Sequence, residues 1–276
     1  MISTLVPTKP VSTANEFIPE GIPSEDGIPM ETPRHRFQMI LLMDSIETRW
    51  AGRKDFYCGG NMFVHFSIQR AMNRDFRGPD FFVVLGVDHD KDRDYWASWD
   101  EDGRLPDVII ELLSASTEST DRTTKKEVYQ NTFHTYEYYL YSPNANDVEG
   151  FRLNDRYLPI RANENGWLWC EKLDCWFGFW KGTYLGLTGT WLRMFEKDGT
   201  LIPNKDEAAI SISQKMIANA KMEAERANAE AARAIAEFAR ANAEFARANE
   251  AEAELARLKA TIAHSQNGHG RNGSTP

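Results

Sequence analysis

Two apolar segments, each accompanied by a carboxylate, decide the fold of this chain: GPDFFVVLGV (78–87) and LPDVIIELLSASTESTDRTTKKEVY (105–129). Asp80 opens the first apolar run, Glu111 lies inside the second, and Lys125 follows in a stretch expected to be helical. Unbroken apolar runs of this length are typical of strands that are buried on both faces. We therefore predict two central strands of one sheet, followed by a helix.

Glu111 is the first candidate for a functional residue, because it interrupts an otherwise apolar strand. An ionised carboxylate buried without a partner costs several kcal/mol, so Glu111 requires a cation, a metal ion or a raised pKa. An alternative stays open, in which Glu111 stands at a strand end and reaches solvent or pairs with an arginine.

The helix expected after this strand begins in a Ser/Thr-rich stretch, where Thr120 and Asp121 are candidates for its cap. Lys125 and Tyr129 are four residues apart and share one face of that helix. The strand YEYYLYS (136–142) follows, and this strand, helix, strand succession indicates a crossover within a mixed sheet.

The acidic linker DHDKDRDYWASWDEDG (88–103) has Asp at alternate positions, as a calcium-binding loop does. Such a loop requires Gly at its sixth position and Glu at its twelfth, which are Arg93 and Trp99 here. The linker is therefore interpreted as a solvated connection.

Other predicted elements surround these strands. Apolar residues at spacings of three and four predict an amphipathic helix over 34–50. Gly59-Gly60-Asn61 lies between two alternating segments and predicts a tight hairpin. A further hairpin is expected over 148–160, and the aromatic, Gly-rich stretch 166–200 is predicted to form strands that cover one side of the sheet.

The ends of the chain differ from the body in composition. Residues 1–33 are Pro-rich and are predicted to be a flexible lead-in, the globular domain spans 34–204, and 264–276 read as a disordered tail. Between them, 205–263 is predicted to be one long helix. It carries the heptads EAERANA, EAARAIA, EFARANA and EFARANE from residue 223 onward.

The heptads give a thin seam, with Ala224, Ala231, Phe238 and Phe245 at position a and an alanine at each d position from 227 to 248. This pattern favours a self-associating coiled coil, and hence a homo-oligomer. The alternative is a charged helix that stays single.

Charge and cysteine content limit the function. The net charge is -9, and residues 1–200 contain 22 Lys+Arg against 31 Asp+Glu, whereas the remainder contains ten of each. Such a body does not attract DNA through its mean field, so a nucleic-acid partner requires a local basic groove or bound divalent ions. Three cysteines without zinc-ligand spacing indicate free thiols. With no apolar run of about 18 residues and no secretory signal, we expect a soluble, cytoplasmic protein that does not enter a membrane.

The order PD, acidic linker, PDVIIELLS, KKEVY and EYYLYSP resembles the Uma-type restriction endonuclease-like proteins, a branch of the PD-(D/E)XK nuclease superfamily. The resemblance covers approximately residues 34–200. It implies an α/β restriction-endonuclease-like core with a mixed sheet and Mg²⁺-dependent hydrolysis of phosphodiester bonds in DNA, with Mn²⁺ as an alternative ion.

The same resemblance assigns the catalytic residues as Asp80, Glu111 and Lys125. Its metal ligands are the Asp80 and Glu111 carboxylates and the main-chain carbonyl of Leu112. The superfamily keeps its lysine two residues after the Glu, where this chain has Leu113, and Lys125 matches the displaced position of the Uma-type branch. Lys125 is expected to lower the pKa of the attacking water or to contact the phosphate.

Further residues stand near this set. His35 or Gln38 on the first helix is a candidate to complete the metal shell, whereas Asp107 is interpreted as structural. Two functions remain open for the chain. One is a metal-dependent DNA endonuclease, and the other is a non-catalytic binding or assembly protein that acts through its C-terminal coiled coil.

Overall fold

The computed structural model describes residues 32–268, and the chain divides into two compact units, Met1–Ala208 and Ala209–Pro276. The predicted flexible lead-in (1–33) lies outside the described residues except for its last two positions, where helix α1 begins. The disordered tail was predicted from residue 264, but the last helix continues to Gly268, so the first five of those residues are helical. Residues 269–276 lie outside the described range.

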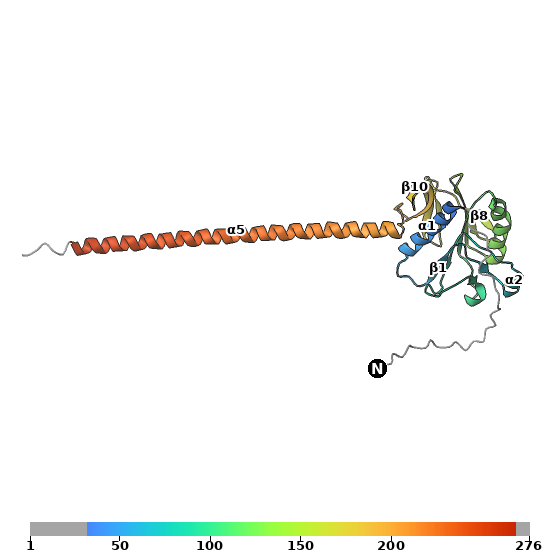
Figure 1. Cartoon of the computed structure of the whole chain (residues 1–276), viewed down its shortest axis with the longest axis horizontal. Helices are drawn as coiled ribbons and strands as arrows, with labels where there is room; N and C mark the ends of the chain where they lie inside the picture. The colour runs from blue at the N-terminus through green and yellow to red at the C-terminus, as the bar shows by residue number, and fades with distance from the viewer. Residues whose placement is uncertain (1–31, 269–276) are drawn as a thin grey trace, which may run out of the picture. The chain divides into compact units, whose positions relative to one another are not determined.

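The globular unit is built on a six-stranded sheet in the order β1-β3-β5-β6-β7-β8. Its strands are β1 (Phe56–Gly59), β3 (Phe81–Leu85), β5 (Val108–Leu112), β6 (Glu137–Ser142), β7 (Asp147–Leu153) and β8 (Tyr157–Pro159). Figure 1 labels two of these strands, β1 and β8. Only β5 and β6 pair in parallel among these neighbours, and the other pairs are antiparallel. The mixed sheet, the two central strands and the hairpin of β7 with β8 are therefore confirmed.

A helix connects β5 to β6, as a parallel pair requires. It runs without interruption through α3 (Glu118–Thr120), η2 (Asp121–Lys125), α4 (Lys126–Val128) and η3 (Tyr129–Phe133). The η2 and η3 segments have wide turns of the i→i+5 type. We call 118–133 the site helix, because its side chains face the end of β5.

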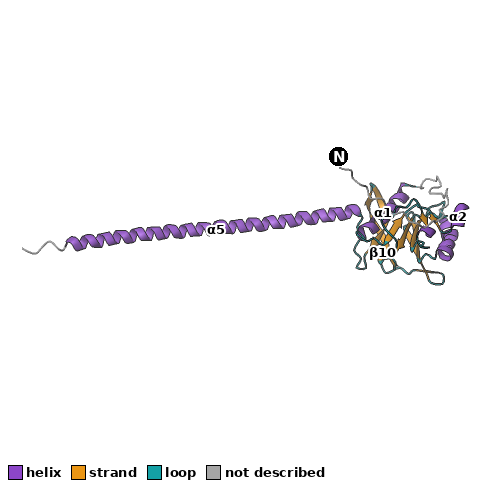
Figure 2. Cartoon of the chain, turned by 90° about the horizontal axis from the view of Figure 1, so that it is seen from below, coloured by secondary structure: helices purple, strands orange, loops and turns teal. Residues whose placement is uncertain are grey.

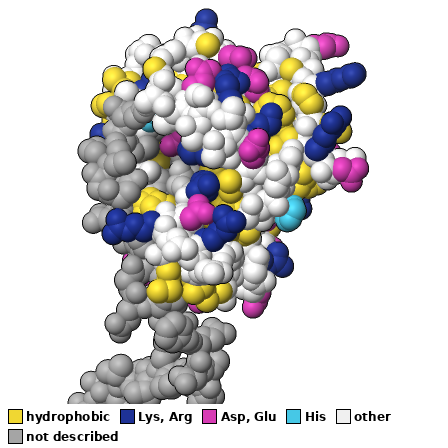
Figure 3. All heavy atoms as spheres, turned by 90° about the vertical axis from the view of Figure 1, so that its right-hand side faces the viewer, with side chains coloured by type: hydrophobic (Ala, Val, Ile, Leu, Met, Phe, Trp, Pro, Cys, Tyr) yellow, Lys and Arg dark blue, Asp and Glu magenta, His cyan; other side chains and the backbone are white. Residues whose placement is uncertain are grey.

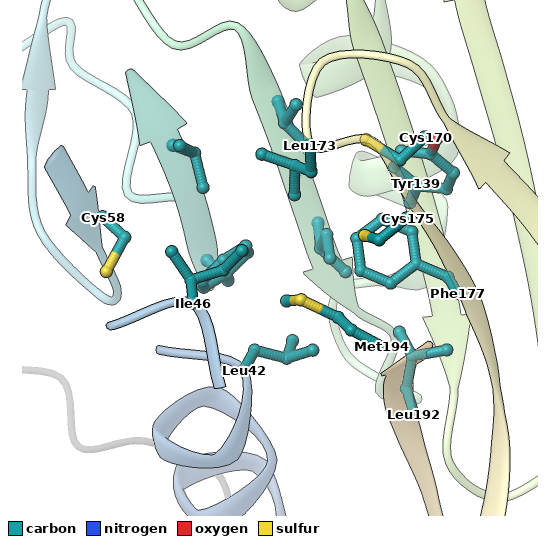
Figure 4. Packing of buried hydrophobic residues seen from close by; sticks show 14 of the residues in the cluster. Leu42, Ile46, Cys58, Tyr139, Cys170, Leu173, Cys175, Phe177, Leu192 and Met194 are labelled. Carbon is teal, nitrogen blue, oxygen red and sulfur yellow. The ribbon is translucent and has the colours of Figure 1, made fainter. Parts of the chain in front are cut away.

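A second sheet covers one face of the first, in the order β11-β10-β9. Its strands are β9 (Leu168–Cys170), β10 (Cys175–Tyr184) and β11 (Leu187–Phe195). Between the sheets lies a core to which helix α1 (Pro33–Arg49) adds Leu42 and Ile46, which lie near Met194 of β11 and Phe177 of β10 (Figure 4). The predictions for 34–50 and for 166–200 are thus confirmed.

The predicted hairpin at Gly59-Gly60-Asn61 is wrong. Strand β1 pairs with β3, whereas the next segment forms β2 (Val64–His65), which pairs in parallel with β4 (Trp96–Ala97). Asn61 has a left-handed φ of 50° and donates its N–H to the Pro79 carbonyl at 3.0 Å. The turn therefore directs the chain away from β1, because its polar groups pair with the residues before β3 instead.

The other face of the six-stranded sheet is covered by the site helix and by the β2–β4 region, which includes helix α2 (Ile68–Met72) and the short 3₁₀ turn η1 (Ser98–Asp100). A second apolar cluster lies there and contains Val64, Phe82, Trp96, Ile109 and Tyr129. Both faces of β3 and β5 are therefore buried, as their unbroken apolar runs predict.

Helix α5 (Lys205–Gly268) is continuous over 64 residues (Figure 2). Asn204 caps it, since the Glu207 N–H donates to Asn204 Oδ1 and the Asn204 N–H donates to Glu207 Oε2, each at 2.9 Å. The predicted long helix is confirmed, whereas its pairing as a coiled coil stays a prediction.

The described part of the chain also shows the state of the cysteines and whether its helices could cross a membrane. The three cysteines are buried and free. In residues 32–268, the helices are too short or too polar to cross a membrane.

Candidate active site

The antiparallel pairing of β3 with β5 brings Asp80 next to Glu111. Phe81 faces Ile110 in the register, so the residue before β3 and the residue near the end of β5 are neighbours. Asp80 is partly exposed and accepts a hydrogen bond from the Leu112 N–H at 2.7 Å. The two predicted carboxylates therefore form one site.

Glu111 is completely buried, and two side chains of the site helix reach it. Lys125 Nζ donates to Oε2 at 3.0 Å, and the Tyr129 hydroxyl donates to Oε1 at 2.7 Å. The cation that burial of this carboxylate requires is thus Lys125, whose own side chain is 19% exposed. The structure brings together all three of the predicted catalytic residues.

Asp121 is a fourth member of the site, and sequence reasoning assigned it to the helix cap instead. The helix begins earlier, at Glu118, so Asp121 lies within the helix and its side chain is only 1% exposed. Its Oδ1 lies 2.8 Å from Lys125 Nζ. Both of its carboxylate oxygens are buried without a hydrogen-bond partner among residues 32–268, so Oδ1 contacts Lys125 as an ion pair only. The spacing of four between Asp121 and Lys125 was the available signal.

The wide turns of the site helix explain how Asp121, Lys125 and Tyr129 act on one carboxylate. In an α-helix with 3.6 residues per turn, side chains four apart are offset by about 40°, so three of them spread over about 80°. Turns of the i→i+5 type reduce this offset, and such turns occur frequently at functional sites. The helix therefore stacks the three side chains over the end of β5.

The electrostatics of the site follow from its burial. Burial raises the pKa of Glu111 to about 8, against the favourable charge of Lys125, and Asp80 and Asp121 add to the rise. Burial also raises the pKa of Asp80. Burial alone lowers the pKa of Lys125, but the surrounding carboxylates more than reverse this, so Lys125 stays charged. Three carboxyl groups surround one lysine, which leaves an electrostatic demand for a further cation.

The Leu112 carbonyl is the remaining predicted ligand, and α1 reaches it. His35 Nε2 lies 3.1 Å from the Leu112 oxygen, and His35 Nδ1 lies 2.8 Å from Thr32 Oγ1. Gln38 is occupied elsewhere, because its amide exchanges two hydrogen bonds with the main chain of Leu192. Of the two candidates on the first helix, only His35 contacts the site.

Asp107 does not belong to the site. It accepts a hydrogen bond from the Leu85 N–H at 2.8 Å and lies 3.5 Å from Lys172 Nζ. These contacts fix the start of β5 against the end of β3, in agreement with a structural role.

The donor set fits a hard divalent ion. Two carboxylates and one main-chain carbonyl lie at the start of β3 and the end of β5, and oxygen ligands of this kind are those that Mg²⁺ takes while it keeps several waters. The unpartnered Asp121 Oδ2 adds to the local negative charge. Within residues 32–268, no three His, Cys, Asp or Glu side chains form a group that could hold a metal ion.

Charges of both signs are mixed on one face of the globular unit. Figure 3 shows the face that carries α2 and the site helix, where Lys and Arg side chains alternate with Asp and Glu. At physiological ionic strength, charges of both signs that lie about 8 Å or more apart are largely screened. A nucleic acid that approaches this face meets local charges rather than the mean charge of the chain.

One family of known proteins matches a large part of the chain. The model of the Uma2 family, described as "Putative restriction endonuclease", matches residues 25–179, which is more than half of the chain. A solved structure of a "putative nuclease belonging to DUF820" from Anabaena variabilis ATCC 29413 shares 15% sequence identity. That match has a TM-score of 0.39 and covers 52% of this chain and 76% of the other. No curated protein matches the chain.

Proposed function

The chain belongs to the Uma2 family, and from this premise we propose that it is a metal-dependent DNA endonuclease that hydrolyses phosphodiester bonds. The observation that carries the proposal is the convergence of Asp80, Glu111 and Lys125 at one partly open site. A buried carboxylate beside a second carboxylate and a lysine is an arrangement suited to phosphoryl chemistry.

A divalent ion, Mg²⁺ or Mn²⁺, would be held by Asp80, Glu111 and the Leu112 carbonyl. When bound, such an ion supplies Lewis acidity at the phosphate and lowers the pKa of a bound water. The protein's part is to keep these oxygens in place. Tyr129 does so for Glu111, and the Leu112 N–H does so for Asp80.

Lys125 is assigned to the phosphate. Its ammonium carries three N–H donors, of which one donates to Glu111, while Asp121 Oδ1 forms an ion pair with the same ammonium at 2.8 Å. A remaining N–H can donate to a phosphate oxygen as negative charge develops during hydrolysis. Asp121 thereby positions Lys125 without contacting the substrate.

His35 is assigned a positioning role from α1. Its Nε2–H donates to the Leu112 oxygen when Nδ1 accepts from the Thr32 hydroxyl. This contact fixes the carbonyl that the ion requires.

The test is cleavage of supercoiled plasmid, linear duplex and single-stranded DNA by the purified full-length chain, with Mg²⁺, Mn²⁺ or EDTA. We expect cleavage with either metal, and its loss in Glu111→Gln and Lys125→Met. Lys126→Met is the matched control, because Lys126 lies over the Phe151 ring at 3.3 Å and not beside Glu111. Clean protein that cuts none of these substrates with either metal would refute the proposal.

Metal binding is measured separately from cleavage. We expect calorimetry to detect Mn²⁺ binding to the wild-type protein and at least a tenfold weaker association with Asp80→Ala. Equal binding to both proteins would remove Asp80 from the ligand set, whatever the cleavage result.

A second function is favoured by one observation, the long row of exposed apolar side chains on α5. It is a binding or assembly protein whose nuclease-like unit no longer cuts. DNA binding without cleavage, together with self-association through α5, is the expected result for that protein.

A further inference from the structure

The exposed apolar residues of α5 follow the heptad repeat. In the described part of this helix, eleven large apolar side chains are exposed, and nine of them occupy positions a, d, e or g. Only Ile212 and Met222 fall outside these positions. Phe238 and Phe245 are 70% and 69% exposed. We call the a and d positions from Ile210 to Ile262 the seam.

The period of the seam specifies the kind of partner. A straight α-helix has 3.6 residues per turn, so a strict seven-residue repeat drifts by about 20° per heptad around its surface. The drift is removed only when the helix supercoils around another helix. The partner is therefore a helix with the same repeat, rather than a flat surface or a pocket.

We propose that α5 pairs with α5 of a second copy of this chain, in an antiparallel two-stranded coiled coil whose twofold axis passes at the level of Ala236. This inference does not rest on the proposed nuclease function. Two features of the seam select this arrangement.

The first feature is charge. In a parallel pair in register, Glu252 would face its own copy at position a, and Lys259 would do the same one heptad later. Like charges held in a partly dehydrated seam are unfavourable. In the antiparallel arrangement each a residue faces a d residue, so Glu252 meets Ala220 of the partner subunit and Lys259 meets Ser213 of the partner subunit.

The second feature is size. With the axis at Ala236, large residues meet either apolar or small ones. Ile210 faces the partner's Ile262, Ile217 faces the partner's Leu255, and Phe238 and Phe245 face alanines at positions 234 and 227. Outside the seam, Met216 lies beside the partner's Leu258, and Ile235 lies beside its own copy. A register shifted by one heptad places the axis between residues 239 and 240. In that register Ile235 faces Asn242 and Leu258 faces Glu223, so two apolar side chains meet polar ones.

The flanking charges oppose this arrangement weakly. Glu237 lies beside its own copy at position g, and Glu230 lies beside Glu244 of the partner subunit. These pairs lie at the solvated edge, where interactions between charges are weak because water and salt screen them. Each of these glutamates has Arg233 or Arg240 within four residues on its own helix, and that arginine offsets the repulsion.

Cysteine cross-linking of the full-length chain tests the direction and register. We expect Ala231→Cys/Ala241→Cys to form intermolecular disulfides on mild oxidation, because those two positions face each other across the pair. Ala231→Cys alone should not, since its copy lies ten residues along the axis, about 15 Å away. The wild-type protein is the background control for its three native cysteines. Efficient linking by Ala231→Cys alone, or no linking by the double variant, would overturn the proposal.

The mass in solution tests whether the pair forms at all. We expect light scattering to give twice the 31.5 kDa chain mass for the wild-type protein. For Phe238→Glu we expect the mass of a single chain. Ala236→Glu adds the same charge at position f, outside the seam, and should keep the dimer. A monomeric wild-type protein, or a dimer that Phe238→Glu leaves intact, contradicts pairing through the seam.

Discussion

At the scale of single residues, the site is governed by the burial of Glu111. The side chain has no exposure, and its two oxygens are bonded by Lys125 and Tyr129. The nearby carboxyls of Asp80 and Asp121 oppose its ionisation. The proposed divalent ion would displace the proton of Glu111, and this exchange would link metal binding to pH.

The unfolding free energy of the metal-free protein should therefore fall as the pH rises from about 4.5 to about 8. The pKa of Glu111 is raised from 4.5 to about 8 on folding, so the folded state binds a proton more tightly than the unfolded state. The resulting stabilisation is complete below pH 4.5 and is lost as pH rises to about 8, each pKa unit being worth about 1.4 kcal/mol. Urea unfolding in EDTA between pH 5 and pH 8 measures this slope.

Glu111→Gln is the control for that slope, because an amide cannot ionise. In this variant we expect the unfolding free energy to change little between pH 5 and pH 8. Above pH 8 the variant should be more stable than the wild-type protein. Identical pH dependence in both proteins would mean that Glu111 does not carry the proton.

At the scale of elements, the end of β1 determines where Asp80 lies. Gly60 approaches the residue so closely that an added Cβ would lie 2.8 Å from the Asp80 carbonyl oxygen and 2.5 Å from the Met39 side chain. The turn after β1 also binds the residues before β3 through Asn61 and Pro79. Three elements, α1, β1 and β3, therefore meet behind the site.

Gly60→Ala should disturb this junction. The Met39 side chain can move, but the Asp80 main chain cannot shift without displacing its carboxylate, so we expect a loss of about 1–3 kcal/mol in unfolding free energy. Mn²⁺ affinity should fall with it. Gly78→Ala is the matched control, since its Cβ would meet Phe63 at an ordinary 3.5 Å. If both variants behave alike in denaturation and calorimetry, the close approach at Gly60 has no role.

At the scale of the whole molecule, the first turn of α5 belongs to the globular unit rather than to the rest of that helix. Arg193 is buried at 1% exposure and forms an ion pair with Glu207, and the cap between Asn204 and Glu207 fixes the same turn. The boundary between units lies at Ala208, after these contacts.

Truncation should separate the two units at that boundary. We expect residues 1–208 to unfold with the stability of the globular unit in the full chain and to be monomeric. Residues 1–204 leave Arg193 buried without Glu207, which should cost about 3 kcal/mol. Thermal unfolding and light scattering of both truncations measure these outcomes. Equal stability of the two would show that the first turn of α5 does not belong to the globular unit.

The sequence by itself determined the features that depend on neighbouring residues. A carboxylate inside an apolar run identified Glu111, and helical periodicity identified α1 and α5, because burial and helix formation are read over a few turns of chain. The resemblance identified Asp80 and Lys125. The four-residue spacing of Lys125 and Tyr129 also predicted that they share a face.

The tertiary structure alone decided which distant groups meet. His35 contacts the Leu112 carbonyl across 77 residues, and Gln38 pairs with Leu192 across 154. The direction of the chain after Gly60 depends on such pairings, which no local pattern encodes. Glu111 was recognisable in the sequence because a buried carboxylate needs a compensating partner. Lys125 and Tyr129 become its partners, and Asp121 opposes its ionisation, only when the site helix packs on β5.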